Sequence, residues 1–313
     1  MKPLIAVVGP TATGKTEVSI RLAQKTGGEI VNADSRQVYR YMDIGTAKPT
    51  QEEHSLVPHH LFDVVDPDDD FSLALYQDMA ISAIGNIHYR GKTPILTGGS
   101  GQYVWAVLEG WSVPEVAPDE QLRRELERKA AEQGGEALFE ELKKVDPQAA
   151  EQIDPRNIRR IIRALEVCRA TGKKFSELRT KHPPDFDVRI LGLTVERDEL
   201  YRRIDARVDA MMERGFVDEV RGLIDRGYSL DLSAMSSLGY REVGRHLKGE
   251  TSLEEAVRQI KFATHRFARQ QYAWFKLSDS RIRWFDISRT SAGKIISSLA
   301  DDIGERAKQR GEK

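Results

Sequence analysis

The chain has 313 residues, 40% of them hydrophobic, and a formal net charge of −1. This length and composition exclude an intrinsically disordered protein and predict one large domain with an insertion, or two domains. No apolar run is long enough to span a bilayer and no signal peptide precedes the first strand pattern, so we expect a cytoplasmic protein without membrane contact. The single cysteine, Cys168, excludes an internal disulfide bond.

Charge is unevenly distributed along the chain. Residues 50–154 contain 8 Lys and Arg against 21 Asp and Glu, a net charge of −13, whereas residues 155–276 contain 25 against 18, a net charge of +7. This asymmetry is compatible with a polyanionic partner on one part of the surface and equally with an ordinary solvated surface.

The first motif joins an apolar run over residues 4–8 to a helix pattern that starts near Glu17. Its spacing is G-x-x-x-x-G-K-T, which suits phosphate groups because backbone N–H groups, a helix N-terminus and a lysine converge on them. We predict that the following residues bind the phosphates: Gly9, Pro10, Thr11, Ala12, Thr13, Gly14, Lys15 and Thr16. The Thr16 hydroxyl is expected to hold Mg²⁺ or a phosphate oxygen. Kinases, NTPases and transferases that use other diphosphates share such a loop, so it does not identify the ligand.

A second strand is predicted over residues 29–33, next to the strand of the phosphate loop, and Asp34 follows it. Ligands of open α/β sheets bind at the carboxyl ends of the strands. Asp34 is therefore a candidate general base or metal ligand, with a turn-forming role as the alternative.

Three segments together resemble a known family: GPTATGKT from Gly9, NADSRQVY from Asn32 and MDIGTAKP from Met42. They are similar to the tRNA dimethylallyltransferases, also called tRNA isopentenyltransferases. The resemblance implies transfer of a dimethylallyl group from dimethylallyl diphosphate to N6 of the adenosine 3-prime of the anticodon, with Mg²⁺ and with tRNA as the partner of a monomeric enzyme. It also implies tRNA contacts by Asp34, Ser35, Arg36 and Gln37.

The next segments contain a strand with an acidic turn over residues 59–67, a helix over residues 73–90 and a strand over residues 93–97. His59 and His60 lack the partners of a metal site and are more typical of a loop. The loop after the last strand resembles the family's GGTG segment, with Ser100 in place of threonine, and its hydroxyl is expected to donate to a phosphate or a base of the tRNA.

From residue 113 to residue 187 the pattern is helical and charged, which predicts an insertion domain between core segments 1–112 and 188–313. Within it, Asp154 and Pro155 are expected to cap and start a helix. One side of that helix is apolar, and the other carries Arg156, Arg159, Arg160 and Arg163. We predict that these arginines contact the tRNA backbone, with a solvated face as the alternative.

The chain returns to the sheet with a strand over residues 188–195 and continues with a helix over residues 197–215. In the family pattern Arg207 on this helix holds the diphosphate opposite the phosphate loop. Asp205 and Asp209 lie only two residues from Arg207, so neither can pair with it along the helix.

The segment over residues 236–242 also matches the family and places Gly239, Tyr240 and Arg241 at the tRNA. Tyr240 is expected to stack on a base and Arg241 to bind a phosphate. A long helix over residues 253–276 follows, with Gln271 on its inner side and the family's closing motif over residues 266–275.

These features predict an α/β fold, with a P-loop parallel sheet flanked by helices and a mostly helical insertion. The expected catalytic residues are Asp34, which accepts the proton of the amine, and Thr16 and Arg207, which stabilise the leaving diphosphate. A P-loop nucleotide kinase, an adenylate isopentenyltransferase and an RNA-binding NTPase switch remain alternatives. The basic helix at Arg156 to Arg163 and the long helix over residues 253–276, which is also basic, favour an RNA substrate.

Overall fold

The computed structural model describes residues 2–114 and 116–298. The chain forms two compact units: one contains the residues up to Leu108 and from Asp185 onward, and the other contains Glu109–Pro184. The sequence placed the boundaries at residues 113 and 187. Among the described residues, no helix combines the length and the apolar character that a membrane crossing requires.

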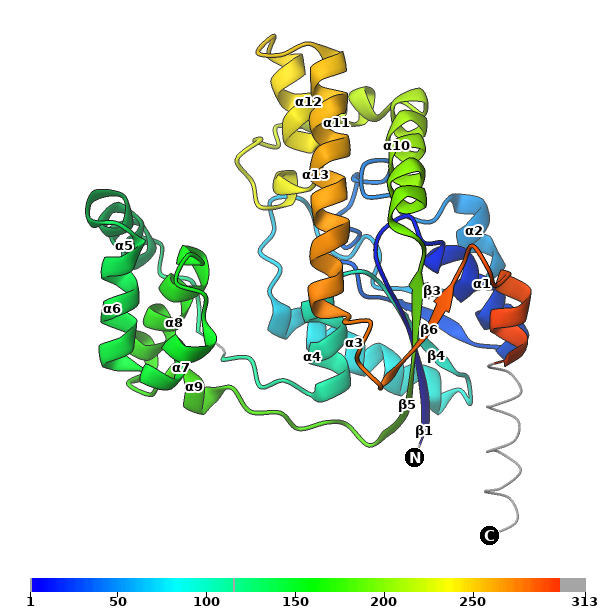
Figure 1. Cartoon of the computed structure of the whole chain (residues 1–313), viewed down its shortest axis with the longest axis horizontal. Helices are drawn as coiled ribbons and strands as arrows, with labels where there is room; N and C mark the ends of the chain where they lie inside the picture. Colours follow the sequence, from blue (N-terminus) through cyan, green and yellow to red (C-terminus); the bar gives the residue numbers. More distant parts are fainter. Residues whose placement is uncertain (1, 115, 299–313) are drawn as a thin grey trace. The chain divides into compact units, whose positions relative to one another are not determined.

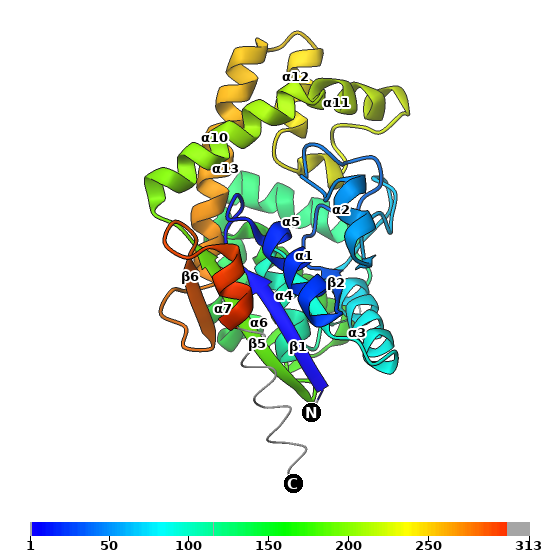
Figure 2. The same cartoon turned by 90° about the vertical axis from the view of Figure 1, so that its right-hand side faces the viewer.

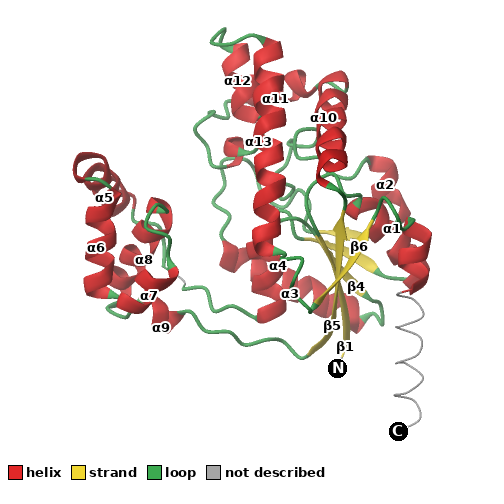
Figure 3. Ribbon diagram, viewed as in Figure 1, coloured by secondary structure: helices red, strands yellow, loops and turns green. Residues whose placement is uncertain are grey.

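In the described part of the first unit, six strands form one parallel sheet in the order β3-β2-β4-β1-β5-β6. Figure 3 shows the strands in yellow, surrounded by helices in red. The strands are β1 Lys2–Val8, β2 Glu29–Asn32, β3 His59–His60, β4 Pro94–Thr97, β5 Phe186–Thr194 and β6 Ile282–Asp286. Residues 4–8 of β1 are fully buried, as expected for a central strand covered on both faces. The parallel α/β architecture is therefore confirmed.

Helices cover both faces of this sheet, with α1 and α3 on opposite sides (Figure 1). The helices of the first unit are α1 Lys15–Thr26, α2 Gln51–Leu56, α3 Leu73–Tyr89, α4 Gly101–Glu109, α10 Arg197–Glu213, α11 Phe216–Asp225, α12 Tyr240–Leu247 and α13 Leu253–Trp274, with a 3₁₀ turn at Ala234–Ser236. Figure 2 shows that α10 to α13 lie beyond the carboxyl ends of the strands. This is the edge at which parallel α/β sheets bind ligands.

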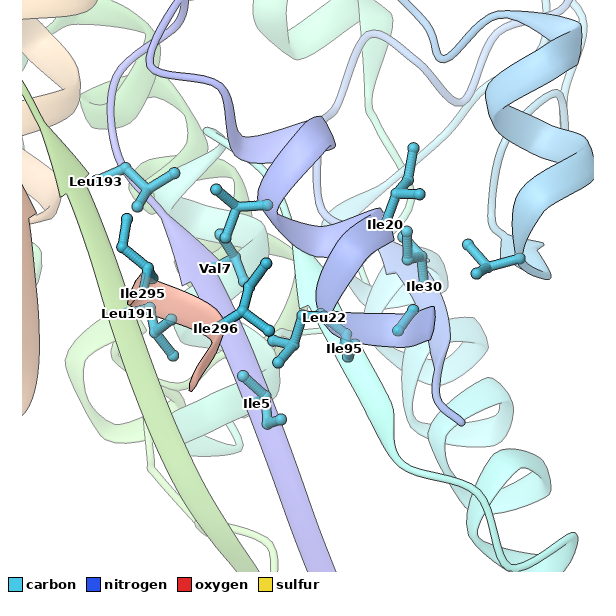
Figure 4. Close-up of a cluster of buried hydrophobic side chains, with 13 residues drawn as sticks. Ile5, Val7, Ile20, Leu22, Ile30, Ile95, Leu191, Leu193, Ile295 and Ile296 are labelled. Atoms are coloured by element: carbon cyan, nitrogen blue, oxygen red, sulfur yellow. The ribbon is translucent and has the colours of Figure 1, made fainter. Parts of the chain in front are cut away.

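One buried cluster fixes α1 on the sheet (Figure 4). It joins alternate residues of β1, Ile5 and Val7, to Leu22 of α1, Ile95 of β4 and Leu191 of β5. Each such side chain contributes about 1.5–3 kcal/mol on full burial. The start of α1, and with it the loop that precedes this helix, is thereby held on the sheet.

The second unit has its own hydrophobic core, which includes Leu126, Leu138, Leu142, Ile161 and Leu165. Its helices are α5 Glu120–Gln133, α6 Gly135–Val145, α7 Pro147–Gln152, α8 Ile158–Thr171 and α9 Phe175–Leu178. The helical character of this part of the chain is as predicted.

Two sequence-based expectations about the strands are wrong. The strand predicted over residues 59–67 has only two residues, because Leu61 and Asp63 adopt positive φ angles of 66° and 53° and turn the chain out of the sheet. The strand before Asp34 does not neighbour β1 either. It pairs with β3 and β4, and β4 lies between it and β1.

The helix predicted from Asp154 and Pro155 starts later than expected. It begins at Ile158, and Asn157 caps it by accepting a hydrogen bond from Arg160 N. The carboxylate of Asp154 instead accepts hydrogen bonds from the backbone and side chain of Arg156, which lies outside the helix.

Candidate active site

The loop from Gly9 to Thr16 joins β1 to α1 and has the backbone of an anion-binding loop. Gly9 has a φ of 137°, and a Cβ at this position would lie 2.3 Å from the carbonyl oxygen of Leu193, so the loop passes too close to β5 for any other residue. Ala12 and Gly14 also have positive φ angles, of 63° and 78°. Such alternation turns successive N–H groups towards one side, and the N-terminus of α1 adds its partial positive charge there.

Two side chains close this loop on itself. The hydroxyl of Thr13 and the ammonium of Lys15 both donate to the carbonyl oxygen of Pro10, each at 2.8 Å. Thr16 lies in the first turn of α1 and lines the cavity at the loop. The structure therefore brings together the residues that the sequence predicted for the phosphate site.

Two cations and one carboxylate meet at this loop. Burial of the ammonium, followed by repulsion from Arg207, lowers the pKa of Lys15 to about 8, while Asp34 acts in the opposite direction. Burial also lowers the pKa of Arg207, and Asp34 partly offsets this effect. The charge of one carboxylate does not balance two cations, so the site favours a bound anion.

Arg207 reaches the loop from α10, and its Nη1 lies 3.3 Å from the Thr11 hydroxyl. Asp205 is close to His265, at 2.8 Å, and Asp209 pairs with Lys261, at 2.7 Å. As expected from the spacing, the acids adjacent in sequence are engaged elsewhere, and Arg207 is directed to the site.

Asp34 lies at the same edge of the sheet, although two strands away from β1. Its carboxylate accepts a hydrogen bond from Arg36 N at 2.9 Å, and its own N–H donates to the side chain of Asn32 at 2.9 Å. Gly98 comes directly after β4 and packs against the backbone of Ala33. A Cβ at Gly98 would lie 2.0 Å from the Ala33 carbonyl oxygen. The missing side chain allows the end of β4 to pack against the segment that carries Asp34.

The three residues after Asp34 bond to neighbouring loops. Ser35 N donates to the Ser100 hydroxyl at 2.9 Å, and the two hydroxyl groups are 3.2 Å apart. The guanidinium of Arg36 donates to Ser233 O and to the Ser236 hydroxyl. The side-chain N–H₂ of Gln37 donates to the carbonyl oxygens of Thr46 and Ala47. The tRNA contacts implied for Ser35, Arg36, Gln37 and Ser100 remain predictions.

Gln271 is a site residue whose role the sequence did not reveal. Its side-chain oxygen accepts from Thr11 N at 2.8 Å, and its side-chain nitrogen donates to Gly99 O at 3.0 Å. The amide is buried and joins the phosphate loop to the loop after β4. The available signal was a polar residue on the apolar side of a long helix.

A cavity of about 390 Å³ adjoins the phosphate loop and is lined at one end by Thr11, Asp34 and Arg207. Much of the remaining lining is apolar and comes from the helices beyond the sheet: Val208, Met211, Met212, Phe216, Ile260 and Trp274. A smaller cavity of about 130 Å³ lies along the loop itself, next to Lys15 and Thr16. The two cavities share Thr11, Asp34 and Arg207, so a charged subsite opens into an apolar one.

The prediction that Tyr240 stacks on a base is wrong for this structure. Its ring is fully buried edge-on against Phe216, and its hydroxyl donates to Glu219 at 2.7 Å. Gly239 is buried as well, and a Cβ there would lie 2.7 Å from Phe216. Arg241, in contrast, is exposed, and its contact with RNA stays a prediction.

The four arginines of the second unit do not form one basic face. Arg163 donates to Glu166, which is 1% exposed, and also to Pro114 O. Arg156 is bound to Asp154 outside α8. Only Arg159 and Arg160 project from the first turn of α8 without a carboxylate partner among the described residues.

A parallel α/β sheet with a cationic G-x-x-x-x-G-K-T loop at the carboxyl ends of its strands, next to a partly apolar cavity, is the architecture of a P-loop protein. The sequence model of the IPP transferase family matches residues 37–278. The chain therefore belongs to the IPP transferase family.

Relatives and solved structures agree with this assignment. The chain is 60% identical over 276 residues to a tRNA dimethylallyltransferase of Roseiflexus castenholzii, covering 88% of this chain and 90% of the relative. It is 47% identical over 309 residues to one of Dehalococcoides mccartyi, covering 99% and 95%.

Two crystallographic studies describe similar folds. The tRNA isopentenylpyrophosphate transferase of Bacillus halodurans has a TM-score of 0.73 at 42% identity, covering 100% of this chain and 99% of the other. A eukaryotic dimethylallyltransferase acting on tRNA has a TM-score of 0.82 at 29% identity, covering 97% and 80%.

Proposed function

We propose that the chain transfers a dimethylallyl group from dimethylallyl diphosphate to N6 of the adenosine 3-prime of the anticodon in tRNA. The observation that carries this proposal is the continuity of the two cavities: a cationic phosphate loop opens into an apolar space, and Asp34 lines both. The tRNA substrate of the named relatives agrees with it.

The donor binds with its diphosphate in the loop and its hydrocarbon in the larger cavity. Backbone N–H groups of residues 12–16, Lys15 and Arg207 hold the phosphate oxygens, and they stabilise the charge that grows on the leaving diphosphate. The apolar side chains from α10, α11 and α13 exclude water from the reacting carbon.

The donor set at the loop suits Mg²⁺. This ion keeps several waters and takes one or two protein oxygens together with phosphate oxygens. The Thr16 hydroxyl is such an oxygen, and the described residues contain no cluster of three or more His, Cys, Asp or Glu side chains that would favour another metal. When bound, Mg²⁺ neutralises part of the diphosphate charge.

The reaction exchanges one bond for another. N6 of the adenine attacks C1 of the dimethylallyl group, the bond from C1 to the diphosphate oxygen breaks, and Asp34 accepts the proton that N6 loses. The base leaves its stack to enter the cavity. We expect a monomer to act on cytoplasmic tRNA, with Arg159, Arg160 and Arg241 at the RNA backbone and the loops of Ser35 to Gln37 and Ser100 at the base.

The test is transfer from labelled dimethylallyl diphosphate to an unmodified anticodon stem-loop, with AMP as the competing acceptor. Label on the stem-loop but not on AMP is the expected result. Label on AMP alone would assign an adenylate isopentenyltransferase. Consumption of ATP with a nucleoside monophosphate, without prenyl transfer, would assign a kinase and overturn the proposal.

A further inference from the structure

Glu219, on α11, is bound by a loop that lies about 175 residues earlier in the chain. Its Oε2 accepts from Asp43 N at 2.9 Å and from Ile44 N at 2.6 Å, and its Oε1 accepts from Gly45 N at 3.1 Å. The Tyr240 hydroxyl donates a fourth hydrogen bond at 2.7 Å. Hydrogen bonds to an ionised carboxylate are about twice as strong as neutral ones, so this arrangement fixes the loop firmly.

The loop over residues 43–48 is held on its other sides as well. The ammonium of Lys48 is buried and donates to Tyr39 O and to the carboxylates of Asp43 and Asp63. Gly45 packs so closely on α11 that a Cβ would lie 2.3 Å from the ring of Phe216. The loop therefore has one well-defined conformation, including the left-handed Ala47 with a φ of 51°.

This loop is part of the wall of the site, whereas Glu219 is not. Gly45 and Thr46 line the larger cavity, and Thr46 and Ala47 line the smaller one. The carbonyl oxygens of Thr46 and Ala47 each accept from the side-chain nitrogen of Gln37 at 3.0 Å. Fixing the loop thus fixes Gln37, three residues after Asp34.

We propose that Glu219 is a positioning residue for the transfer reaction. From outside the cavities it sets the conformation of residues 43–47, which contribute to the walls of both, and through them the position of the Gln37 amide at the smaller cavity. The proposal rests on the function proposed above. It assigns Glu219 to the alignment of the two reactants and not to the hold on the diphosphate, because the phosphate loop has its own supports in Lys15, Arg207 and Gln271.

The test is Glu219→Gln, which keeps the size but places an N–H₂ group against the backbone N–H groups. We expect kcat to fall by about 10–100-fold, in line with the cost of small misplacements. The Kd for dimethylallyl diphosphate should stay within a few-fold of wild type. Hydrogen exchange at the amides of residues 43–45 should accelerate by at least about tenfold.

Two matched variants separate positioning from general stability. Tyr240→Phe removes one hydrogen bond from the carboxylate and the interaction of the hydroxyl with the Thr46 backbone, but leaves the three loop amides bound to Glu219. The losses of kcat and loop protection should therefore be clearly smaller than in Glu219→Gln. Glu213→Gln changes an exposed acid on α10 and should alter nothing. If Glu219→Gln fails to fold, Glu219→Asp replaces it, with an intermediate loss of kcat and loop protection.

Three outcomes would overturn the proposal. They are wild-type kcat in Glu219→Gln, an equal loss in Tyr240→Phe, and a loss of donor affinity as large as the loss of kcat. If the wild-type protein transfers no prenyl group to the stem-loop, the proposed function fails instead. The exchange rates at residues 43–45 and the donor Kd remain measurable in that case, so the two failures can be told apart.

Discussion

Asp34 lines both cavities, and no other carboxylate of the described residues lines either of them. Asp34→Asn keeps the shape and one acceptor oxygen but cannot take a proton. We expect a loss of about 10²–10⁴ in rate, or about 2.7–5.4 kcal/mol of barrier. Single-turnover rates at saturating tRNA and donor measure the loss, and both affinities should stay within a few-fold of wild type.

The control for Asp34→Asn is a magnesium titration. If Asp34 served as a metal ligand, the variant would bind the donor weakly and excess Mg²⁺ would restore part of the rate. Restoration by Mg²⁺, or a wild-type rate, contradicts the assignment of Asp34 as the general base.

The depressed pKa of Lys15 makes donor binding depend on pH. The pKa is about 8 in the free protein. A bound diphosphate favours the charged ammonium and raises this pKa, so binding takes up a proton above pH 8. The Kd for dimethylallyl diphosphate should therefore change little just below pH 8 and rise above it, by up to about tenfold per pH unit.

Isothermal titration calorimetry in buffers of different ionisation enthalpy measures both the Kd and the proton uptake. Lys15→Arg keeps its charge throughout this range, so it should lose the pH dependence even if its affinity is lower. A wild-type Kd that stays constant from about pH 7 to about pH 9.5 would show that Lys15 does not titrate on binding.

At the level of residues, the sequence predicted those features of the site that depend on the spacing of neighbouring residues. The G-x-x-x-x-G-K-T spacing fixes the loop around Lys15, and the helical period excludes an acid partner for Arg207. Gln271 and Glu219 escaped prediction because their partners lie 260 and about 175 residues away. Tyr240 was misassigned because an aromatic residue in a polar motif gives no sign of its burial.

At the level of elements, the first turn of α8 is the place in the second unit where we predict a contact with RNA. Replacing Arg159 and Arg160 with alanine should weaken tRNA binding and lower the slope of log K against log salt by up to about 0.7–0.9 per lost phosphate contact. Donor affinity should not change. The control is Arg128→Ala, which removes an exposed arginine of α5. If the double variant has the same slope of log K against log salt as this control, Arg159 and Arg160 do not contact RNA phosphates.

The third arginine of this helix should behave differently. Arg163→Ala leaves the buried Glu166 with fewer partners, although Arg123 still donates to both of its oxygens. We expect the free energy of unfolding to fall by about 1–3 kcal/mol, with little change in the salt slope. The sequence grouped Arg163 with Arg159 because it shows the helical period but not the buried acid beside it.

Helix and strand boundaries were predicted best where the pattern is long. The predicted helix over residues 73–90 corresponds to Leu73–Tyr89, and the strand over residues 188–195 corresponds to Phe186–Thr194. The order of the strands was not predictable, because the insertion of β4 between β1 and β2 depends on contacts between distant segments. Two sites of positive φ, at Leu61 and Asp63, shortened β3 without a glycine to reveal them.

At the level of the whole molecule, the second unit can be excised with a single new connection, because its first and last segments lie side by side. Its first and last segments run antiparallel, with His182 N donating to Gly110 O at 2.8 Å and a bridge between Trp111 and Lys181. A short glycine linker from Gly110 to His182 should therefore leave the sheet intact. We expect near wild-type affinity for dimethylallyl diphosphate and a marked loss of tRNA affinity.

Fluorescence titrations with donor and with tRNA measure the two affinities, and circular dichroism checks that the sheet is retained. Unchanged tRNA affinity in the excised protein would show that the RNA binds the first unit alone.

The residues of the phosphate site lie far apart in the sequence, and this affects how the site forms during translation. A ribosome releases the chain from its N-terminal end, so the segment from Gly9 to Thr16 emerges before the residues that support it. Its supports, Arg207 and Gln271, follow 196 and 260 residues after Thr11, and β5 completes the burial of β1 only after the whole second unit. A growing chain thus carries an unfinished phosphate loop, and the capacity to capture a prenyl donor arises only after Gln271 has been added and has left the ribosome.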